Sequence, residues 1–405
     1  MVASISALTS SAQASNYYEA DDYYAEGSLS PSEWQGAGTK QLGLSGEVGR
    51  EQFRDLLDGK FPNGQQLGTI RDGKLEHRPG WDVTMSAPKS VSIMAEVAGD
   101  RRLIKAHDKA VKSALAFAER HAAATRIRSD GKAKRHTTDN LAIASFRHDT
   151  SRAQDPQLHT HNVILNMTRD GEGNWRSIEP RALYQLQKSI GAIYRQELAR
   201  GVRELGYAIE TGTDSMFEIK GVSEDVIRAF SERAGQVEAR LAERGQTRET
   251  ASAAEKQVAA LDTRDAKKTV NRREMVKEWR ATADKAGFGQ KDRQELVAKA
   301  EARAADADLG RRLDAEGKLL ASRAVAFAAE NLSERQSVFS AADLEKEAGR
   351  IGMGKASSVQ ISSAIGSARE NGELVPRTFL DKRGAEFSGY TTPVNIENER
   401  RLLCA

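Results

Sequence analysis

The stretch FRHDTSRAQDPQLHTHNVILN, residues 146–166, holds three of the seven histidines of the chain. His159 and His161 bracket a single threonine, and His148 comes just before a polar loop. Side chains alternate along a strand, so His159 and His161 are expected to point to the same face. If the two strands that carry the three histidines are neighbours, their imidazoles converge on one point. The stretch therefore predicts a site for a divalent metal ion.

The segments around this stretch predict a mixed α+β fold. Alternation and β-branched residues are typical of strands at 81–87, 140–148 and 160–168. Apolar residues at helical spacing predict a long helix over 101–128, and turn residues at 169–174 predict a hairpin turn into Trp175. The chain up to about residue 220 is therefore expected to combine a sheet with helices.

A single histidine on a strand is more often a packing or surface feature than a ligand. Three histidines on paired strands, within 14 positions, favour the metal site. The only cysteine is Cys404, so thiolate ligands are excluded, and Mg²⁺, Mn²⁺ and Zn²⁺ all remain suitable ions. Asp149 and Asp155 are expected to cap the loop between the strands, although Asp149 is close enough to His148 for a ligand role to stay open.

The composition describes a polar protein that is able to fold, with 39% hydrophobic residues and a mean hydropathy of −0.59. The 61 Lys and Arg against 58 Asp and Glu give a net charge of +3, too balanced to predict nucleic-acid binding alone. A single cysteine excludes a disulfide scaffold and favours a reducing cytoplasm. The N-terminus lacks the basic and apolar regions of a signal peptide, and no apolar run has the length of a membrane helix.

Four of the eight tyrosines lie in NYYEADDYYAEG, residues 16–27. Their neighbours are mostly acidic or polar, which argues against positions in a core. Exposed tyrosines stack on bases or act as nucleophiles towards phosphorus. A free phenol has a pKa of about 10, so a nucleophilic tyrosine needs a metal ion for the phosphate charge and an acceptor for its proton. The tyrosine pairs alone are a weak indication of function, and they become a specific one only in combination with the histidine site.

The composition changes after about residue 223 to Ala, Arg, Glu and Lys, which predicts solvated helices and a charged helical linker over 291–320. The segment 321–405 is expected to form a separate small unit. In it, SAAD at 340–343 is a capping-box variant that opens a helix, a second helix follows near 357–371, and a hairpin comes last. This order predicts a winged-helix-like unit.

GRIGMGKAS, residues 349–357, nearly matches a phosphate-binding loop. Ala356 stands where a Ser or Thr must bind Mg²⁺, and a helix is expected before the loop in place of a strand. The sequence therefore argues against nucleotide binding at this loop.

The tyrosine pairs, GWDVTMSAPKS (80–90) and HDTSRAQDPQLHTHNVILN (148–166) occur in an order that resembles the MobF-type conjugative relaxases. These belong to the HUH endonucleases, named for a His-hydrophobic-His pair, and Thr160 replaces the hydrophobe here. The resemblance runs from about residue 10 to 290. It implies an antiparallel sheet flanked by helices, the palm of these enzymes.

The same resemblance implies a domain organisation. The catalytic palm covers 1–222 and a helical fingers region covers 223–290. After the linker, 321–405 is similar to the segment that leads into a helicase in this family. The chain is therefore expected to be the N-terminal part of a relaxase-helicase, able to nick DNA without unwinding it.

The resemblance also implies roles for single residues. Tyr17 matches the initiating nucleophile with Tyr18 as its nearest competitor, while Tyr23 and Tyr24 match a second pair implicated in a later strand transfer. The residues that match the metal site are His148, His159 and His161 as ligands, with Asp82 as the acidic residue that orients a ligand histidine or takes the proton of the tyrosine. Candidate contacts to DNA are Lys74, Arg78, Lys89, Arg147, Arg152 and Arg176.

The function implied is site- and strand-specific DNA nicking and rejoining at a plasmid transfer origin, by a metal-dependent transesterase that forms a covalent 5′-phosphotyrosine for conjugative transfer. Expected partners are single-stranded and hairpin DNA of the origin, accessory relaxosome proteins and the type IV secretion coupling protein. The chain is expected to act as a monomer, without membrane insertion, in the cytoplasm of a bacterial donor cell and to be translocated with the DNA.

Two alternatives to a conjugative relaxase stay open. A rolling-circle replication initiator would use the same chemistry, although the helicase-leading tail favours transfer. A non-catalytic, metal-stabilised DNA-binding repressor would leave the tyrosine pairs unexplained.

Overall fold

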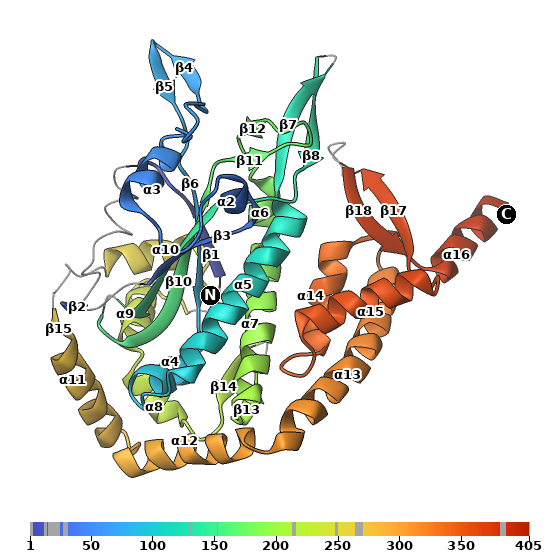
Figure 1. The fold of residues 1–405 in the computed structure, drawn as a ribbon. Helices are drawn as coiled ribbons and strands as arrows, with labels where there is room; N and C mark the ends of the chain where they lie inside the picture. The colour runs from blue at the N-terminus through green and yellow to red at the C-terminus, as the bar shows by residue number, and fades with distance from the viewer. Residues whose placement is uncertain are drawn as a thin grey trace.

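A five-stranded antiparallel sheet lies at the centre of the protein in the computed structural model shown in Figure 1. In order across the sheet, the strands are β1 (Ala3–Ala7), β6 (Gly80–Ser86), β10 (Pro156–Leu165), β9 (Ile143–Thr150) and β3 (Ser32–Gln35). The structure describes residues 3–11, 14, 25–26, 31–129, 131–151, 153–212, 216–247, 250–263, 270–380 and 386–404. The strands expected at 81–87, 140–148 and 160–168 are confirmed as β6, β9 and β10, with shifted ends.

β10 is the central strand and is buried along almost its whole length. Because side chains alternate along a strand, β10 presents His159 and His161 to one face of the sheet and Thr160 and Asn162 to the other. We call these the histidine face and the threonine face. The two faces are covered by different parts of the chain, so each has its own environment.

Three helices cover the threonine face: α4 (Lys89–Glu96), α5 (Arg102–Ala122) and α7 (Gln187–Glu204). α5 buries apolar side chains at helical spacing, among them Leu103, Ala110 and Phe117, and these join the largest hydrophobic core with residues of β6 and α7. On the histidine face, α3 (Arg50–Leu57) packs Phe53 against Phe146 of β9, with ring centroids 5.2 Å apart. The expected antiparallel sheet flanked by helices is confirmed.

Two β-ribbons project from the same end of the sheet (Figure 1). One is formed by β4 (Thr69–Arg71) and β5 (Lys74–Glu76), the other by β7 (Ala124–Ser129) and β8 (Lys132–Thr137). Asp72 and Gly73 connect the first pair with φ angles of 48° and 73°, the left-handed conformations that a type I′ turn requires at both central residues.

The helix expected over 101–128 is wrong in its last part, because α5 ends at Ala122 and the chain continues as β7. The β-branched residues Thr125 and Ile127 alternate with arginines, and this period of two is typical of a strand. The hairpin turn expected at 169–174 is confirmed between β11 (Thr168–Arg169) and β12 (Trp175–Arg176).

Short elements connect the sheet to the helices that follow. They are α2 (Ala37–Gln41), α6 (Arg181–Gln185), β13 (Ile209–Thr211) and β14 (Phe217–Ile219). The expected fingers region contains α8 (Glu224–Ala229), α9 (Glu232–Ala242), α10 (Ala253–Asp262) and α11 (Arg272–Lys285). A parallel pair joins β15 (Val270–Asn271) to β2 (Ala25–Glu26) just before α11 begins.

α12 (Gln290–Ala304) crosses the base of the molecule in Figure 1, and α13 (Ala307–Ser333) rises from there to the C-terminal unit. α12 packs on the core: Gly206 has a φ of 87°, and a Cβ there would lie 2.0 Å from the carbonyl oxygen of Ala300. The segment 291–320, expected as a linker, thus packs through Ala300 against Gly206, which follows α7. α13 continues through residue 320 without a break, and the C-terminal core takes its residues from Ala321 onward.

The C-terminal unit has the expected winged-helix-like order. After α13 come β16 (Phe339–Ser340), α14 (Ala341–Ile351), α15 (Ser358–Glu370), β17 (Val375–Leu380), β18 (Glu386–Thr391) and α16 (Pro393–Cys404). The three strands form an antiparallel sheet in the order β16-β18-β17. Ser340 caps α14, with its Oγ accepting a hydrogen bond of 3.0 Å from the backbone N–H of Asp343, as the SAAD motif predicts.

The C-terminal unit is attached to α7 by buried polar groups. Arg203, Arg200 and Gln196 of α7 donate hydrogen bonds to the backbone carbonyls of three consecutive residues, 354–356, in the loop before α15. Glu197 of α7 accepts a hydrogen bond of 2.5 Å from the backbone N–H of Ser358. The carbonyl oxygens of Gly354 and Lys355 therefore face guanidinium groups, the reverse of a loop whose N–H groups hold phosphate.

In the part of the chain that the structure describes, no helix is long and apolar enough to cross a membrane.

Candidate metal centre and DNA-binding surfaces

Three histidine rings meet on the histidine face of β9 and β10. His148 lies directly opposite His159 in the strand register, and His161 follows two residues later. The ring centroids of His148 lie 5.4 Å from those of both His159 and His161, and the last two are 5.2 Å apart. The structure thus brings together the three residues expected as ligands. The expectation that His148 ends its strand is wrong, since β9 continues to Thr150.

Hydrogen bonds fix the orientation of two of the rings. His159 Nδ1 lies 2.8 Å from the carbonyl oxygen of Gln157, which only accepts, so Nδ1 carries the proton and Nε2 keeps its lone pair. Burial lowers the pKa of His159 to about 3, which keeps the ring neutral. His161 Nδ1 lies 2.7 Å from Asp82 Oδ2, so the same tautomer is assigned to His161. Neutral imidazoles with available Nε2 atoms are the form that binds metal ions.

Asp82 lies on β6, beside the strand that carries His161. Its side chain is 7% exposed, and Thr84 Oγ1 donates to both of its oxygens at 3.3 and 3.2 Å. A carboxylate that accepts from the distal N–H of a ligand histidine fixes the ring and increases its basicity. The geometry therefore fits the orienting role among the two roles that the sequence left open for Asp82.

The donor set fits a divalent ion in its spacing. With metal–nitrogen bonds of about 2.1 Å, and roughly 1.2 Å more to each ring centre, tetrahedral ligands place imidazole centroids ~5.4 Å apart. The observed separations are 5.2–5.4 Å. In the described residues, no group of three His, Cys, Asp or Glu side chains is already arranged to hold an ion. The rings therefore still need rotations about their side-chain bonds to aim three nitrogens at one point.

Behind the histidines, on the threonine face, a second buried polar group supports β10. Thr160 Oγ1 lies 2.7 Å from Nε2 of His107 on α5, and Nδ1 of His107 lies 2.7 Å from the hydroxyl of Tyr194 on α7. Both hydroxyls can donate or accept, so either neutral tautomer of His107 is satisfied. His107 and Tyr194 could not be predicted from the sequence, because His107 is 53 residues from Thr160 and 87 residues from Tyr194 in the chain.

The two aspartates of the β9–β10 connection have different partners. Asp149 forms an ion pair with Arg272 of α11, and this ion pair accounts for the position of its carboxylate without a role as a metal ligand. Asp155 accepts backbone hydrogen bonds from Arg233 and Glu232 at the start of α9, so it caps α9 and not its own loop. Burial raises the pKa of Asp155 to about 6.

The four candidate nucleophiles, Tyr17, Tyr18, Tyr23 and Tyr24, and the candidate DNA contact Arg152 lie outside the described residues. The nearest described residue is Ala25 in β2, directly after Tyr24 in the sequence.

The remaining candidate DNA contacts lie in different environments. Arg78 is exposed in a cleft of about 860 Å³ at the base of the β4–β5 ribbon, together with Lys60 and His77. Lys74 lies in β5 of that ribbon. Lys89 is directed inward: its Nζ donates to the carbonyl of Pro156 at 3.1 Å, and burial lowers its pKa to about 8.

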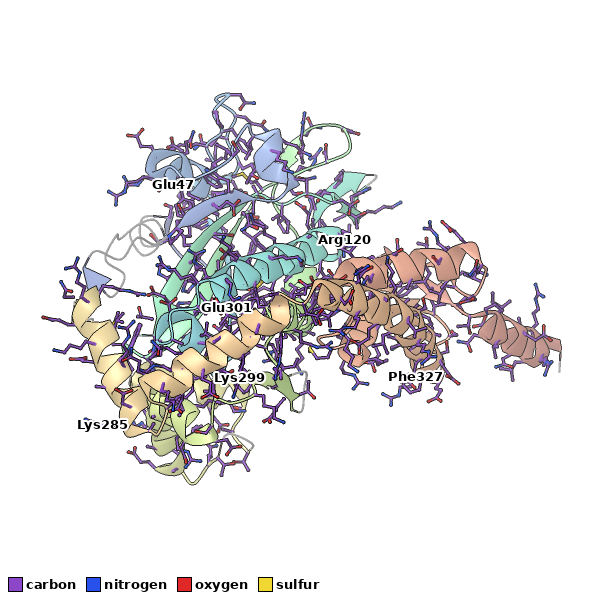
Figure 2. All side chains as sticks on the ribbon, turned by 60° about the horizontal axis from the view of Figure 1, so that its bottom comes forward. Glu47, Arg120, Lys285, Lys299, Glu301 and Phe327 are labelled. Carbon is purple, nitrogen blue, oxygen red and sulfur yellow. The ribbon has the colours of Figure 1, made fainter. Side chains whose placement is uncertain are left out.

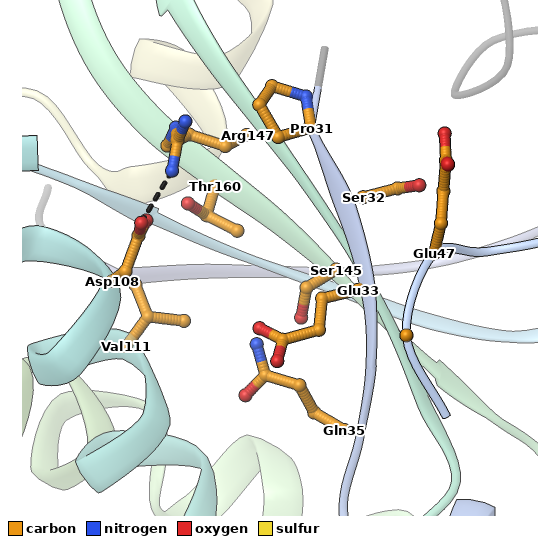
Figure 3. Close-up of a pocket in the computed structure, with 11 residues that line it drawn as sticks. Pro31, Ser32, Glu33, Gln35, Glu47, Asp108, Val111, Ser145, Arg147 and Thr160 are labelled. Atoms are coloured by element: carbon orange, nitrogen blue, oxygen red, sulfur yellow. Dashed lines mark hydrogen bonds and ion pairs between the residues drawn. The ribbon is translucent and has the colours of Figure 1, made fainter. Parts of the chain in front are cut away.

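Arg147 and Arg176 are engaged in ion pairs within the protein. Arg176 pairs with Asp170, and Arg147 pairs with Asp108 of α5. Arg147 and Asp108 line a cavity of about 280 Å³ that also contains Glu33, Ser145 and Thr160 (Figure 3). This cavity lies on the threonine face, so Arg147 is on the opposite side of the sheet from the histidines.

The β7–β8 ribbon carries exposed basic side chains that were not predicted from the sequence. By the strand register, Arg126 and Arg128 lie on one face of the ribbon, and Lys134 and His136 lie on the other. The signal for the ribbon was present in the Asp-Gly pair of SDGK, residues 129–132, which is typical of a two-residue hairpin turn. The β7–β8 ribbon projects from the same end of the sheet as the β4–β5 ribbon (Figure 1).

Comparison with known proteins identifies the family. A model of the TrwC relaxase family matches residues 11–286. Because the match spans well over half of the 405 residues, the chain belongs to the TrwC relaxase family. The multifunctional conjugation protein TraI of Escherichia coli (strain K12) is 41% identical to it over 296 residues, which is 70% of this chain and 16% of TraI. The chain thus spans about a sixth of the length of that curated relative.

Solved structures of the conjugative relaxase TrwC share the fold. A copper-bound complex with oriT DNA has a TM-score of 0.65 and 43% identity, over 70% of this chain and 98% of that one. A metal-free complex with oriT DNA has a TM-score of 0.65 and 41% identity, over 71% and 99%. A complex with a 27-mer DNA comprising the recognition hairpin and the cleavage site has a TM-score of 0.64 and 40% identity, over 70% and 98%.

Proposed function

We propose that this chain nicks and rejoins one DNA strand at a plasmid transfer origin by metal-dependent transesterification, through a covalent 5′-phosphotyrosine. The observation that carries the proposal is the cluster of His148, His159 and His161, oriented by Asp82, in a member of the TrwC relaxase family. The TrwC structures with oriT DNA, described as copper-bound and as metal-free, support both the DNA substrate and a metal ion.

The three histidines would hold a divalent ion, with Mg²⁺ or Mn²⁺ favoured and Zn²⁺ as a further candidate. When bound, such an ion withdraws negative charge from the non-bridging oxygens of the scissile phosphate. Asp82 keeps the Nδ1 proton of His161 in place, so the ring presents Nε2 to the ion. The hydrogen bond from His159 Nδ1 to Gln157 does the same for the second ring.

Tyr17 is the proposed nucleophile, with Tyr18 as its competitor. The phenol oxygen forms a bond to phosphorus while the bond from phosphorus to the 3′ oxygen breaks. The phenol proton passes to an acceptor at the site, and the leaving 3′ oxygen gains a proton to become a hydroxyl. Attack by a 3′ hydroxyl on the phosphotyrosine reverses these steps, so the strand is rejoined without ATP. Tyr23 and Tyr24 would serve a later strand transfer.

DNA would be bound at the end of the palm that carries the two ribbons. The exposed cations of the β7–β8 ribbon suit the phosphates of a hairpin duplex, and Arg78 in its cleft suits the adjoining strand. Lys74 belongs to the same surface by its position in β5. We further propose that the chain acts as a monomer in the donor cytoplasm, with relaxosome proteins and a type IV secretion coupling protein as partners.

The direct test is formation of a covalent protein–DNA adduct. The chain is incubated with Mg²⁺ or Mn²⁺ and a labelled single-stranded origin oligonucleotide, and the products are separated under denaturing conditions. We expect a labelled band at the mass of the protein plus DNA, which EDTA abolishes. His161→Ala is expected to lose the adduct while it retains DNA binding.

The failure of the wild-type chain to form an adduct with its origin sequence would contradict the enzymatic proposal and favour the repressor. An adduct that forms in Tyr17→Phe but not in Tyr18→Phe would reassign the nucleophile. A replication initiator would instead cut an oligonucleotide from the replication origin of its plasmid.

A further inference from the structure

Arg272, the first residue of α11, bridges two acidic side chains from different parts of the fold. One guanidinium nitrogen donates to Asp149 of β9, and another donates to Glu96 at the end of α4 at 2.7 Å. The Glu96 side chain is 7% exposed, and burial together with the charge of Asp149 raises its pKa, so the pair of carboxylates depends on a cation between them. The guanidinium also lies 5.6 Å from the ring centre of Trp279.

α11 contacts the β9–β10 hairpin at a second point two helical turns later. Trp279 is seven residues after Arg272, so both side chains share one face of the helix. The indole Nε1 of Trp279 donates to the carbonyl of Gln154 at 2.7 Å. Gln154 has a φ of 62°, a left-handed conformation that a residue with a side chain rarely adopts. α11 thus contacts the hairpin between β9 and β10 at two points. Arg272 contacts the base of the hairpin, and Trp279 contacts its turn.

The residues directly before Arg272 connect α11 to a third part of the chain. Val270 and Asn271 form β15, which pairs in parallel with Ala25 and Glu26 of β2. Asp149 is the neighbour of His148 in β9. The start of α11 is therefore a junction between the histidine strands, α4 and the segment that follows Tyr24 in the sequence.

We propose that Arg272 is a positioning residue for the transesterification, which keeps β2 and the β9–β10 hairpin in a fixed relation so that nucleophile and metal centre are aligned. The inference rests on the proposed function, and it deepens that function by assigning a residue outside the histidine and tyrosine motifs. A misplacement of about 1 Å at a reacting centre can cost roughly 100-fold in rate, so a junction of this kind affects chemistry more than binding.

Lysine cannot replace Arg272 at this junction. A guanidinium presents several N–H groups in a planar fork and reaches two carboxylates at once, whereas an ammonium group is a single point charge. Arg272→Lys therefore keeps the charge and loses the bridge, and Arg272→Gln loses both. Arg280→Gln is the matched control, because Arg280 is an exposed arginine of the same helix.

The test measures the rate of adduct formation in a single turnover, at saturating Mn²⁺ and oligonucleotide, with the dissociation constant for the oligonucleotide and the Tm measured in parallel. We expect Arg272→Lys to lower the rate about tenfold or more, with the dissociation constant changed less than about twofold. Asp149→Asn should lower the rate in the same way, and the double variant Asp149→Asn/Arg272→Gln should be no slower than Arg272→Gln. Arg280→Gln should match the wild-type chain.

A rate in Arg272→Lys equal to that of Arg280→Gln would overturn the inference, and so would a rate that falls only in proportion to DNA affinity. Hydrogen exchange gives an independent readout: Arg272→Lys should speed exchange in the peptides that contain β2 and the β9–β10 hairpin. Unchanged exchange there would also overturn it. If the wild-type chain forms no adduct, the proposed function fails, and exchange alone decides whether Arg272 joins these segments.

Discussion

At the scale of single residues, Asp82 Oδ2 lies 2.7 Å from His161 Nδ1, and Thr84 donates a hydrogen bond to its carboxylate. Alternation along β10 was enough to predict from the sequence that His159 and His161 share one face. The place of Asp82 beside them was implied only by the resemblance to the relaxases, because Asp82 is 79 residues from His161 in the chain and periodicity does not pair distant strands.

Asp82→Asn should weaken catalysis and leave the fold intact. The amide keeps the shape of the carboxylate and loses the charge that orients His161. We expect the rate of adduct formation at limiting Mn²⁺ to fall about 10- to 100-fold, with little change in Tm. The rate is measured across a series of Mn²⁺ concentrations. Asp308→Asn, an exposed substitution on α13, is the control, and an Asp82→Asn rate equal to that of the control would contradict the assignment.

His107 shows a contribution that sequence periodicity could not reveal. It is fully buried, between the hydroxyls of Thr160 and Tyr194, and it belongs to a helix that reads as an ordinary amphipathic segment. Its role depends on tertiary contacts across the threonine face. The same is true of Arg272, whose partner Asp149 is 123 residues away in the chain.

His107 should make the stability of the protein depend on pH. Burial lowers its pKa to about 3 from 6.5. Below pH 6.5 His107 binds a proton in the unfolded chain, whereas in the folded chain it stays neutral down to about pH 3. The contribution of neutral His107 to the free energy of unfolding is therefore complete above pH 6.5 and is lost as the pH falls. Urea unfolding at pH 7.5 and 5.0 should show this loss in the wild-type chain and a smaller loss in His107→Gln. His136→Gln, at an exposed position on β8, should follow the wild type; equal pH dependence in all three chains would contradict the prediction.

At the scale of elements, strands of the central sheet were predicted from local sequence, whereas the β7–β8 ribbon was not. Of the five strands of the sheet, β6, β9 and β10 were predicted from alternation or β-branched residues, whereas β1 and β3 were not. β7 was taken as the end of α5, because Ala122, Ala123 and Ala124 continue the helical pattern and the exposed strand that follows is polar. A projecting ribbon buries little apolar surface, so the alternation of Thr125 and Ile127 with arginines is a weak signal beside the helical pattern that precedes it.

Exposed cations of the β7–β8 ribbon should contribute to DNA affinity through phosphates. Arg128→Ala and Lys134→Ala are each expected to weaken binding of an origin hairpin and to reduce the slope of log affinity against log salt by about 1. Fluorescence anisotropy between about 50 and 200 mM salt measures the slope. Lys318→Ala, an exposed substitution on α13, should leave the slope unchanged. A slope in the ribbon variants equal to that of Lys318→Ala would exclude the ribbon from the interface.

At the scale of the whole molecule, the C-terminal unit packs against α5 and α7. Sequence composition suggested a charged linker, because solvated helices and linkers share the same residue types. The carboxylate of Glu345 on α14 lies 2.9 Å from Arg120 and 2.9 Å from His121 at the end of α5. Figure 2 shows Arg120 at the end of α5 that adjoins the C-terminal unit. α5 therefore contacts β10 through His107 and the C-terminal unit through Arg120 and His121.

Glu345→Ala should loosen this attachment. Glu345 is mostly buried while Arg120 is half exposed, so we expect a loss of about 1–2 kcal/mol in the free energy of unfolding. Hydrogen exchange should become faster in α14 and at the end of α5, with the sheet unaffected. Glu370→Ala, at the exposed end of α15, is the control. Unchanged exchange in α14 would show that the hydrogen bonds from α7 to residues 354–356 hold the unit without help from Glu345.

The most direct test of the central claim is to locate the DNA on the protein. After reaction with Mn²⁺ and an origin oligonucleotide, the adduct is digested with nuclease and trypsin, and the modified peptide is identified by mass spectrometry. The first lysine or arginine of the chain is Lys40, so the first tryptic peptide contains Tyr17, Tyr18, Tyr23 and Tyr24 together. We predict a 5′-nucleotide phosphate ester on Tyr17 of this peptide, absent in EDTA and in His161→Ala. A linkage outside this peptide, or one that forms equally without a divalent ion, would contradict the account.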